Sequence, residues 1–462
     1  MSHVPAFPKG FLWGSSISGG QCEGGYATRG ATVVDHIPQG RGARFAWMRN
    51  PSPVLEGGQG ICLNPNGTDF YGHWKEDIAL LADAGVRALR FSVLWSRIFP
   101  DDREEPSAEG LAFYSNVIDE LLAHDIVPVI TTIHFDMPLW VALRHDGFAT
   151  REGLERYERF VDAIVAAYAD RVKYWISYCE LNNIDFIPFV VAGVADDGSP
   201  EAAQRIKRAE WHLLLGNAYL VRACHAADPS IMVGCEFGFS PTYTLSPSPA
   251  CYAQKLREDA RQYRFSDVLV RGTLPKTYRA ALAQAGIEPT ADELALLQEH
   301  AIDFLAPSYY RSQTVDENGY AQNLSLPVTT FGWTIDPEGL RSMLNEVYAR
   351  YGKPIMIVEN GLGTPDVVGP DGSIQDDYRI EFLRAHIKQM RLAVGCDGVD
   401  MLGYLTWCAF DCVSTSEGLV SKRYGLIYVD VDDEGRGTYA RTPKASAAWF
   451  RRVSDSNGED LD

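Results

Sequence analysis

The feature that most constrains the fold is an alternation of short apolar segments with longer amphipathic ones. Eight apolar segments have the length and composition of buried strands: residues 11–14, 86–94, 126–133, 172–179, 231–235, 302–309, 354–358 and 401–407. Helical periodicity occupies residues 69–84, 111–124, 154–169 and 202–227 between them. Because no linker or low-complexity stretch interrupts this order, the chain is predicted to be α/β: a single (β/α)8 TIM barrel, one domain over residues 1–462.

Two of these segments end in an acid. Residues 354–358 are a run of apolar residues that leads into Glu359, and Asn360-Gly361 then turns the chain out of the sheet. Residues 172–179 make the same approach to Glu180. One strand-end acid is often only a cap or a surface partner. Two of them at the carboxyl ends of barrel strands, where such folds carry their active sites, predict a shared catalytic centre.

Composition excludes several classes of partner. A formal net charge of −19 argues against nucleic acid and against an anionic membrane surface. No basic start with an apolar core opens the sequence, and no run of eighteen apolar residues occurs, so neither a secretory signal nor a membrane span is expected. Nine cysteines without a Cys-x-x-Cys pair indicate free thiols in the cytoplasm. No metal or cofactor is expected, and no oligomeric state is predicted.

Residues 24–67 are rich in Gly, Arg and Pro and are predicted to form one long loop. Loops of that length in a compact domain usually serve function.

Several short motifs, in order along the chain, resemble glycoside hydrolase family 1, the retaining β-glycosidases. They are Phe7-Pro-Lys-Gly-Phe-Leu-Trp-Gly14, Gln21-Cys-Glu-Gly24, His73-Trp-Lys-Glu-Asp-Ile78, Arg90-Phe-Ser-Val-Leu-Trp-Ser-Arg-Ile-Phe-Pro100, His134-Phe-Asp-Met-Pro138, Thr334-Ile-Asp-Pro-Glu-Gly-Leu340 and Val358-Glu-Asn-Gly361. The resemblance extends from about residue 7 to residue 450. It implies Glu180 as acid/base and Glu359 as nucleophile, with Arg90 and Tyr310 contacting the nucleophile. Retaining glycosidases need such a carboxyl pair about 5–5.5 Å apart.

The resemblance also implies the groups that hold the sugar. Gln21 and His134 match hydroxyl ligands of the family, and Trp407 matches its aromatic platform. Trp333 either lines the sugar site or belongs to the core, and the same alternative holds for Tyr309.

The segment after the eighth strand is similar to that of the 6-phospho-β-glycosidases. Ser414 and Thr415 stand where ordinary β-glucosidases of the family carry a Glu-Trp pair, whose carboxylate would repel a phosphate. Together with Ser416, Lys422 and Tyr424 they predict an anion site made of hydroxyls and one ammonium. The alternative is a solvated loop with an incidental lysine. Absence of a bulky Trp at Thr415 favours the gluco series.

One position departs from the family. The acid/base is usually preceded by Asn, which holds the 2-hydroxyl of the sugar, but this chain has Cys179, a weak donor and a weak acceptor. A slow hydrolase, a sugar altered at C2 and diverted chemistry are all compatible with this change. Asn182 or Asn183 could compensate.

The expected activity is retaining hydrolysis of 6-phospho-β-D-glucosides, of the phosphorylated cellobiose or aryl type, to glucose 6-phosphate and an aglycone. The substrate would be a small β-glycoside. Alternatives are an unphosphorylated β-glucosidase or transglycosylase, a barrel acting on a C2-altered sugar, and a non-catalytic binder. Keeping Glu180, Glu359, Arg90, Tyr310 and His134 together favours an enzyme, because a binder does not need all of them.

Overall fold

The computed structural model describes residues 7–52 and 60–462, and in it eight parallel strands close into a barrel. Around the barrel the strands follow the order β1-β11-β10-β7-β5-β4-β3-β2. Each predicted strand corresponds to one of them, so the (β/α)8 architecture is confirmed. Their bounds are β1 Leu12–Ser16, β2 Ala88–Ser92, β3 Val127–Ile133, β4 Tyr174–Tyr178, β5 Met232–Gly238, β7 Phe304–Ser308, β10 Ile355–Ile357 and β11 Met401–Trp407.

The barrel closes where its first strand meets its last. β1 pairs with β11 from Leu12 opposite Gly403 onward, and with β2 through Gly14 opposite Ala88. A Cβ atom at Gly14 would lie 2.3 Å from the Ala88 carbonyl oxygen, so this close approach requires glycine. Closure therefore depends on residues from the two ends of the sequence.

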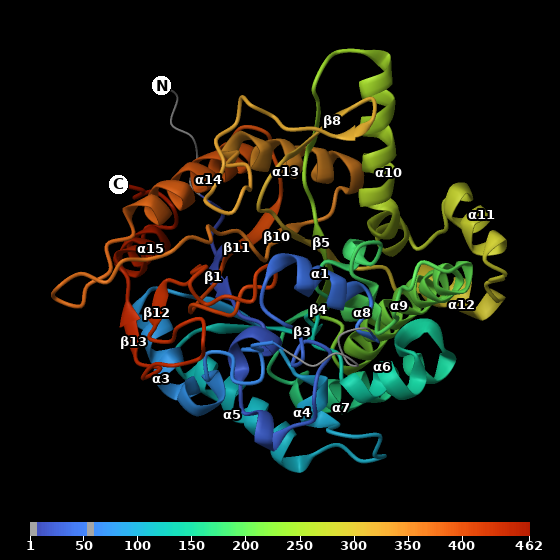
Figure 1. Cartoon of the computed structure of the whole chain (residues 1–462), viewed down its shortest axis with the longest axis horizontal. Coiled ribbons are helices and arrows are strands. Elements are labelled where there is room, and N and C mark those ends of the chain that lie inside the picture. Colours follow the sequence, from blue (N-terminus) through green and yellow to red (C-terminus); the bar gives the residue numbers. More distant parts are fainter. Residues whose placement is uncertain (1–6, 53–59) are drawn as a thin grey trace.

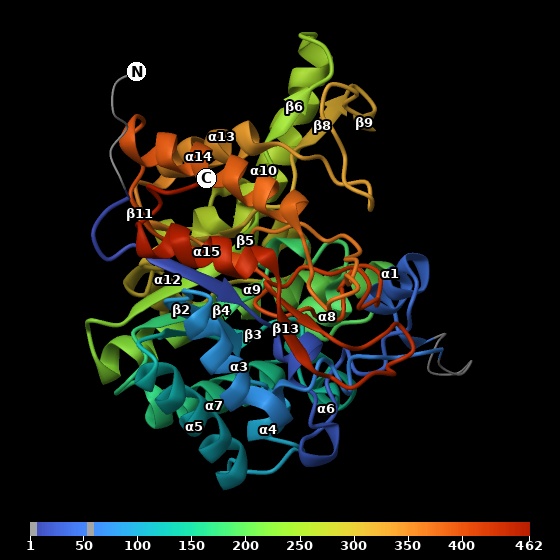
Figure 2. The same cartoon turned by 90° about the vertical axis from the view of Figure 1, so that its left-hand side faces the viewer.

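Helices surround the barrel, as Figures 1 and 2 show. The predicted helical segments are confirmed as α3 (Phe70–Asp83), α5 (Ala108–Ala123), α7 (Arg151–Tyr168) and α9 (Pro200–Ala227). Later helices complete the layer: α13 (Pro337–Tyr351), α14 (Asp377–Gly395) and α15 (Ala445–Asp455). Ser107, Thr150 and Ser199 begin α5, α7 and α9 by accepting a hydrogen bond from a first-turn N–H.

Two apolar clusters hold these layers together. A small one fills the inside of the barrel with residues from five strands or their ends: Val129, Ile176, Phe304, Ala306, Met356, Val358 and Leu405. A much larger one lies between the strands and the helices. Layered filling of this kind makes the barrel interior solid and leaves the carboxyl ends of the strands for a site.

The prediction of one long loop over residues 24–67 was wrong in part. Helix α1 (Arg41–Arg49) lies within it, and residues 53–59 of the predicted loop lie outside the described residues. α1 buries only Arg44, Trp47 and Met48, and Gly40 and Gly42 interrupt its apolar pattern. The packing of Trp47 against Phe189 of α8 (Pro188–Ala192), with ring centroids 6.2 Å apart, supports this short helix where its own sequence does not.

Further elements decorate the carboxyl end of the barrel. Helix α10 (Pro249–Arg271) projects outward beside the small sheet of β6 (Thr242–Thr244), β8 (Gln313–Asp316) and β9 (Gly319–Tyr320), as Figure 2 shows. The remaining elements are α4 (Trp95–Ile98), α6 (Leu139–His145), α11 (Lys276–Gln284), α12 (Ala291–Glu299) and the hairpin of β12 (Ile427–Val429) with β13 (Arg441–Pro443). Within the described ranges, every helix is too short or too polar to cross a bilayer.

Candidate active site

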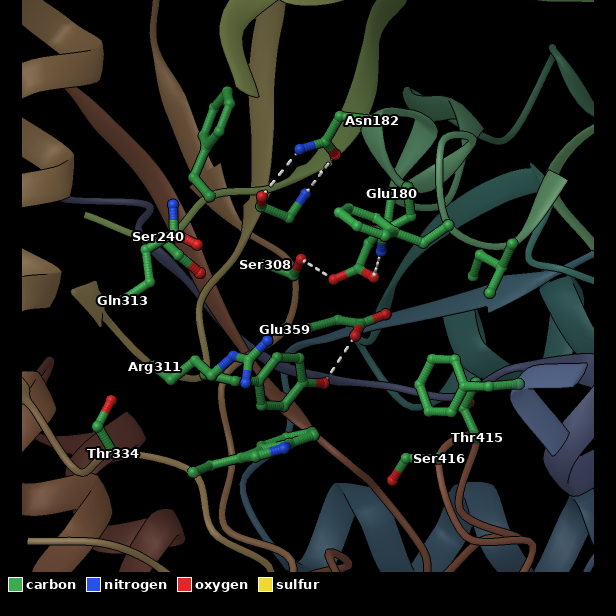
Figure 3. A pocket seen from close by; sticks show the side chains of 18 of the residues that line it. Glu180, Asn182, Ser240, Ser308, Arg311, Gln313, Thr334, Glu359, Thr415 and Ser416 are labelled. Atoms are coloured by element: carbon green, nitrogen blue, oxygen red, sulfur yellow. Dashed lines mark hydrogen bonds between the residues drawn. The ribbon is translucent and has the colours of Figure 1, made fainter. Parts of the chain in front are cut away.

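A cavity of about 990 Å³ opens at the carboxyl ends of the barrel strands. Glu180 and Glu359 both line it, and Figure 3 shows their carboxyl groups facing each other from opposite walls. The strand-end positions that led to their prediction thus converge on one space, as expected for parallel strands whose carboxyl ends meet at one edge.

Glu359 follows β10 and is held by two donors. Arg90 Nη1 donates to its Oε1 at 2.6 Å, and the Tyr310 hydroxyl donates to its Oε2 at 2.7 Å. His134 Nε2 lies 3.4 Å from Oε1. A fully buried guanidinium and a phenol therefore fix the carboxyl group of this side chain with charge-assisted hydrogen bonds.

Glu180 follows β4 in the opposite kind of environment. Burial, followed by the Glu359 charge, raises the pKa of Glu180 to about 7. Ser308 Oγ donates to its Oε1 at 2.6 Å and Asn183 Nδ2 to its Oε2 at 2.5 Å. Its backbone is left-handed, with φ of 39°, a strained conformation that is commonly found at functional sites. Gly238 leaves the room it needs, because a Cβ there would meet Glu180 Oε1 at 2.9 Å.

A third acid, Glu236 on β5, lies at the same centre. It is fully buried and its Oε2 accepts a hydrogen bond from Arg90 Nη2, while its other oxygen has no hydrogen-bond partner within the described part of the chain. Burial raises the pKa of Glu236 well above its usual range, although Arg90 opposes the shift. Arg90 thus bridges two carboxyl groups, and only one of them, Glu359, reaches the cavity.

Cys179 lines the cavity directly before Glu180. Burial, together with the charges of Glu236 and Glu359, raises the pKa of its thiol well above the usual value. The group is therefore an un-ionised thiol. Asn183 bonds Glu180, and Asn182 ties the β4 loop to Gly238 through two 2.9 Å hydrogen bonds.

The residues expected to hold the sugar lie around the same cavity. Gln21, His134, Trp407 and Trp333 all line it. Gln21 Nε2 donates to the Val413 carbonyl at 2.8 Å, so its amide is oriented. His134 Nδ1 lies 3.1 Å from Arg90 Nη2, and burial and Arg90 lower the pKa of His134 well below its usual value. The imidazole is therefore neutral, accepts from Arg90 and presents its Nε2–H to the cavity.

Trp333 is half-buried, packs edge-on against Tyr310 with ring centroids 5.3 Å apart and faces the cavity, whereas Tyr309 is fully buried and donates to the Asp336 carbonyl. The structure thus places Trp333 at the cavity and Tyr309 in the core.

The predicted anion site is only partly open. Thr415, Ser416 and Tyr424 line the cavity, whereas Ser414 and Lys422 do not. Ser414 Oγ accepts from the Glu417 backbone N–H at 3.2 Å and so caps the turn. Lys422 Nζ donates to Ser416 Oγ at 2.9 Å from directly behind the wall.

The Lys422 ammonium lies 4.3–5.8 Å from the ring centroids of Phe331, Trp333 and Tyr424. Burial lowers its pKa to about 8, and it forms no ion pair with an acid of the described chain. It is a nearly buried cation with no carboxylate of the described residues within ion-pair distance, and the charge of Glu417 acts on it only from farther away.

Four residues of the site escaped prediction: Asn183 as a partner of Glu180, Glu236, Ser308 and Arg311. Glu236 directly follows the apolar segment 231–235, and Arg311 directly follows Tyr310, so each had a strand-end signal in the sequence. Arg311 points into the cavity in Figure 3.

Two buried groups place metal-ligating atoms within 4.8 Å of one another: Cys22 with Cys408 and Cys412, and His134 with Cys179 and Glu359. In the second group the guanidinium of Arg90 already neutralises the carboxylate and occupies His134 Nδ1. A cation there would be repelled by Arg90, so the donor set suits the carboxylate's own hydrogen bonds better than a metal.

Comparison with known proteins places this geometry in a family. The family model for glycosyl hydrolase family 1 matches residues 3–459. The chain is 39% identical to aryl-phospho-beta-D-glucosidase BglH of Bacillus subtilis, with 100% of both chains covered. It is 37% identical to a phospho-cellobiase of Klebsiella oxytoca, over 99% of this chain and 100% of the relative.

Solved structures agree with this placement. The family 1 β-glucosidase from Thermotoga maritima superposes with a TM-score of 0.85 at 29% identity, over 99% of this chain and 100% of the other. The matching barrel, the full-length family match and the relatives above lead to one conclusion: the chain belongs to glycosyl hydrolase family 1.

Proposed function

We propose that the protein hydrolyses 6-phospho-β-D-glucosides with retention of configuration, releasing glucose 6-phosphate and an aglycone. The observation that carries the reaction type is the contrast between the two carboxyl groups. Glu359 is fixed by a cation and a phenol, whereas the pKa of Glu180 is raised to about 7. One group is thus prepared to attack and the other to hold a proton, which is the division of roles that retaining hydrolysis requires.

The geometry supports the following steps. Glu359 attacks the anomeric carbon while Glu180 donates its proton to the glycosidic oxygen, so the bond to the aglycone breaks and a glycosyl ester forms. Glu180, now a carboxylate, takes a proton from water. The hydroxide equivalent displaces Glu359 and restores both groups. Arg90 and Tyr310 lose hydrogen-bond strength to Glu359 as the ester forms and regain it on release.

The phosphate is supported by Lys422. A nearly buried ammonium that forms no ion pair with the described residues, behind the hydroxyl of Ser416 and beside the ring of Tyr424, suits an anion that would bring a negative charge close to it. The names of the relatives agree: several are phospho-β-glucosidases or a phospho-cellobiase. The nine free thiols are consistent with action in the cytoplasm.

The test compares a chromogenic β-glucoside with and without a 6-phosphate. We expect a large preference in kcat/KM for the phosphorylated compound and a β-configured first product. A 2-deoxy-2-fluoro 6-phospho-glycoside should label only the peptide that contains Glu359. A preference for the unphosphorylated glucoside would replace the proposal by plain β-glucosidase activity, and labelling elsewhere would refute the assignment of the nucleophile.

A further inference from the structure

The outer part of the cavity, where an aglycone would leave, has an uneven charge. Among the described residues that line the cavity, the acids are Glu180 and Glu359, both at the catalytic centre. Arg49, Arg261 and Arg311 are the lining arginines. Three lining arginines on a chain of net charge −19 raise the question of which of them lacks an acidic partner.

Two of these arginines are already neutralised. Arg49 Nη2 lies 2.7 Å from Asp196 Oδ2. Arg261 Nε lies 3.1 Å from Glu258 Oε2, and its Nη2 donates to the Tyr320 hydroxyl at 3.0 Å. Arg311 differs from both, because it has no hydrogen bond or ion pair to any residue of the described ranges 7–52 and 60–462.

The surroundings of Arg311 place it on the aglycone side. The charged and phenolic groups that act on it are Arg41, Glu180 and Tyr320. Glu180 is the group that must face the glycosidic oxygen, and Tyr320, an exposed residue of β9, lines the same cavity. Figure 3 shows the Arg311 side chain pointing into the cavity toward the two carboxyl groups. Its guanidinium therefore lies next to the space that the leaving group occupies.

We propose that Arg311 makes this a subsite for anionic aglycones, that is, leaving groups that carry an oxyanion such as a carboxylate. This inference rests on the proposed glycosidase function. A guanidinium presents a planar fork of donors that matches a carboxylate in two parallel hydrogen bonds. Without such a ligand, its donors face only the water of the cavity.

A bound oxyanion would also affect the acid. The charged or titratable groups that face Glu180 are Glu359, Arg90, Glu236, Cys179, Tyr310 and Arg311. The positive charge of Arg311 lowers the pKa of Glu180, against the larger effects of burial and of Glu359. An oxyanion on Arg311 cancels that charge, so Glu180 holds its proton to higher pH while such an aglycone is bound.

The experiment uses three aryl 6-phospho-β-glucosides with the full-length protein: 4-nitrophenyl, 4-carboxyphenyl and its neutral isostere 4-carbamoylphenyl. The measured quantity is the ratio of kcat/KM for the carboxylate to that for the carboxamide. In Arg311→Met this ratio should fall by about tenfold to a hundredfold, the effect of losing a charged hydrogen bond. The alkaline limb of kcat should lie at higher pH for the carboxylate than for the carboxamide in wild type, and at the same pH for both in the variant.

Arg49→Met is the matched control, since it removes a cavity arginine that already has a carboxylate partner, and it should leave the ratio unchanged. An equal loss on both aglycones in Arg311→Met would show that Arg311 serves the phosphate or the catalytic groups, and would overturn the inference. So would an equal fall of the ratio in Arg49→Met. If the nitrophenyl compound is not hydrolysed at all, the proposed function itself fails; if it is hydrolysed and the ratio does not respond, only the aglycone inference fails.

Discussion

At the residue scale, the least expected feature is that one arginine holds two carboxyl groups. With both acids ionised, the buried cluster of Arg90, Glu236 and Glu359 would carry a net negative charge. The raised pKa of Glu236 relieves this by keeping its carboxyl neutral. The positive charge of Arg90 is then balanced by the nucleophile Glu359 alone. Glu236 still accepts a hydrogen bond from Arg90 and acts as a positioning residue for it.

Glu236→Gln tests this role. The folded-state pKa of Glu236 is raised, so the acid favours folding at low pH and costs stability as pH rises through that pKa. Glutamine cannot ionise, and it still offers Arg90 an oxygen. We expect the Tm of the variant, relative to wild type, to increase as the pH rises above the ordinary glutamate pKa of about 4.3, measured by calorimetry, with activity near neutral pH retained. A difference in Tm that does not change with rising pH would contradict the raised pKa of Glu236.

Glu236→Ala is the contrasting variant. It removes the buried partner of Arg90, a change that typically costs about 3–5 kcal/mol, and it should lower both stability and kcat. Loss of kcat in the Ala variant together with its retention in the Gln variant would identify the hydrogen bond to Arg90, and not the charge of Glu236, as the contribution of this residue.

Cys179→Asn is expected to speed hydrolysis of simple 6-phospho-β-glucosides. An amide at the edge of the cavity can bond a 2-hydroxyl that the thiol contacts weakly, and such bonds strengthen in the transition state. A gain in kcat/KM of up to about a hundredfold corresponds to about 3 kcal/mol. Cys179→Ser should do far less, because its hydroxyl is shorter. If the Asn variant slows every glucoside tested, the thiol takes part in the reaction.

The catalytic pair could be predicted because each acid ends an apolar run, a signal carried by neighbouring residues. Glu236 also follows an apolar run, but its role could not be predicted, because that role depends on Arg90, a residue 146 positions away, which meets it only when β2 and β5 point into the same barrel. The same reason applies to Ser308, whose hydroxyl reaches Glu180 from β7. Polar residues with distant partners are invisible to local patterns.

At the element scale, buried ion pairs fix the position of the segment between β11 and β12. Asp411 accepts from Arg423 Nη1 at 2.8 Å and from Lys444 Nζ at 2.7 Å. Arg379 donates to the carbonyl of Tyr424 at 3.2 Å. These contacts fix the backbone before and after Lys422. The position of the proposed phosphate subsite therefore depends on the whole segment.

Lys422 should make phosphate binding by this segment depend on pH. Burial lowers the pKa of its ammonium to about 8, so the cation is present below that pH and lost above it. KM for a 6-phospho-glucoside should therefore rise above about pH 8 in wild type, while KM for the unphosphorylated glucoside should not. Lys422→Met should raise KM for the phosphorylated substrate by about tenfold to a hundredfold and abolish this dependence. An unchanged KM would remove Lys422 from the phosphate site.

The elements that were predicted and those that were missed differ in what stabilises them. The barrel strands are apolar along their length, so composition alone locates them. Helix α10 has its buried residues concentrated after Gln262, and its first half projects beside the β6 sheet with a polar surface. Apolar periodicity is weak there, because capping by Ser248 and a small neighbouring sheet support a half-helix that has no core to face.

At the scale of the whole molecule, the two ends of the chain meet at the amino end of the barrel. Trp13 Nε1 donates to Asn457 Oδ1 at 3.0 Å, and Asn457 Nδ2 donates to the Phe7 carbonyl at 2.7 Å. Trp449 Nε1 donates to the Leu461 carbonyl at 3.3 Å. The segment after α15 thereby fixes the position of β1 through hydrogen bonds, and β1 closes the barrel by pairing with β11.

Asn457→Ala tests whether these hydrogen bonds between the two ends of the chain stabilise the entire fold. The change removes the side-chain hydrogen bonds to Trp13, Phe7 and Pro8 and forces alanine into a left-handed conformation, since φ is 51° there. A cost of about 2–4 kcal/mol corresponds to a fall in Tm of about 2–4 °C for a chain of this size. Asn457→Gly loses the same side-chain hydrogen bonds, but glycine tolerates the left-handed conformation, so its Tm should fall less than that of Asn457→Ala. Because the catalytic groups lie at the opposite end of the barrel, kcat at 25 °C should be unchanged in both variants. A fall in kcat without a fall in Tm would instead connect the two ends of the barrel.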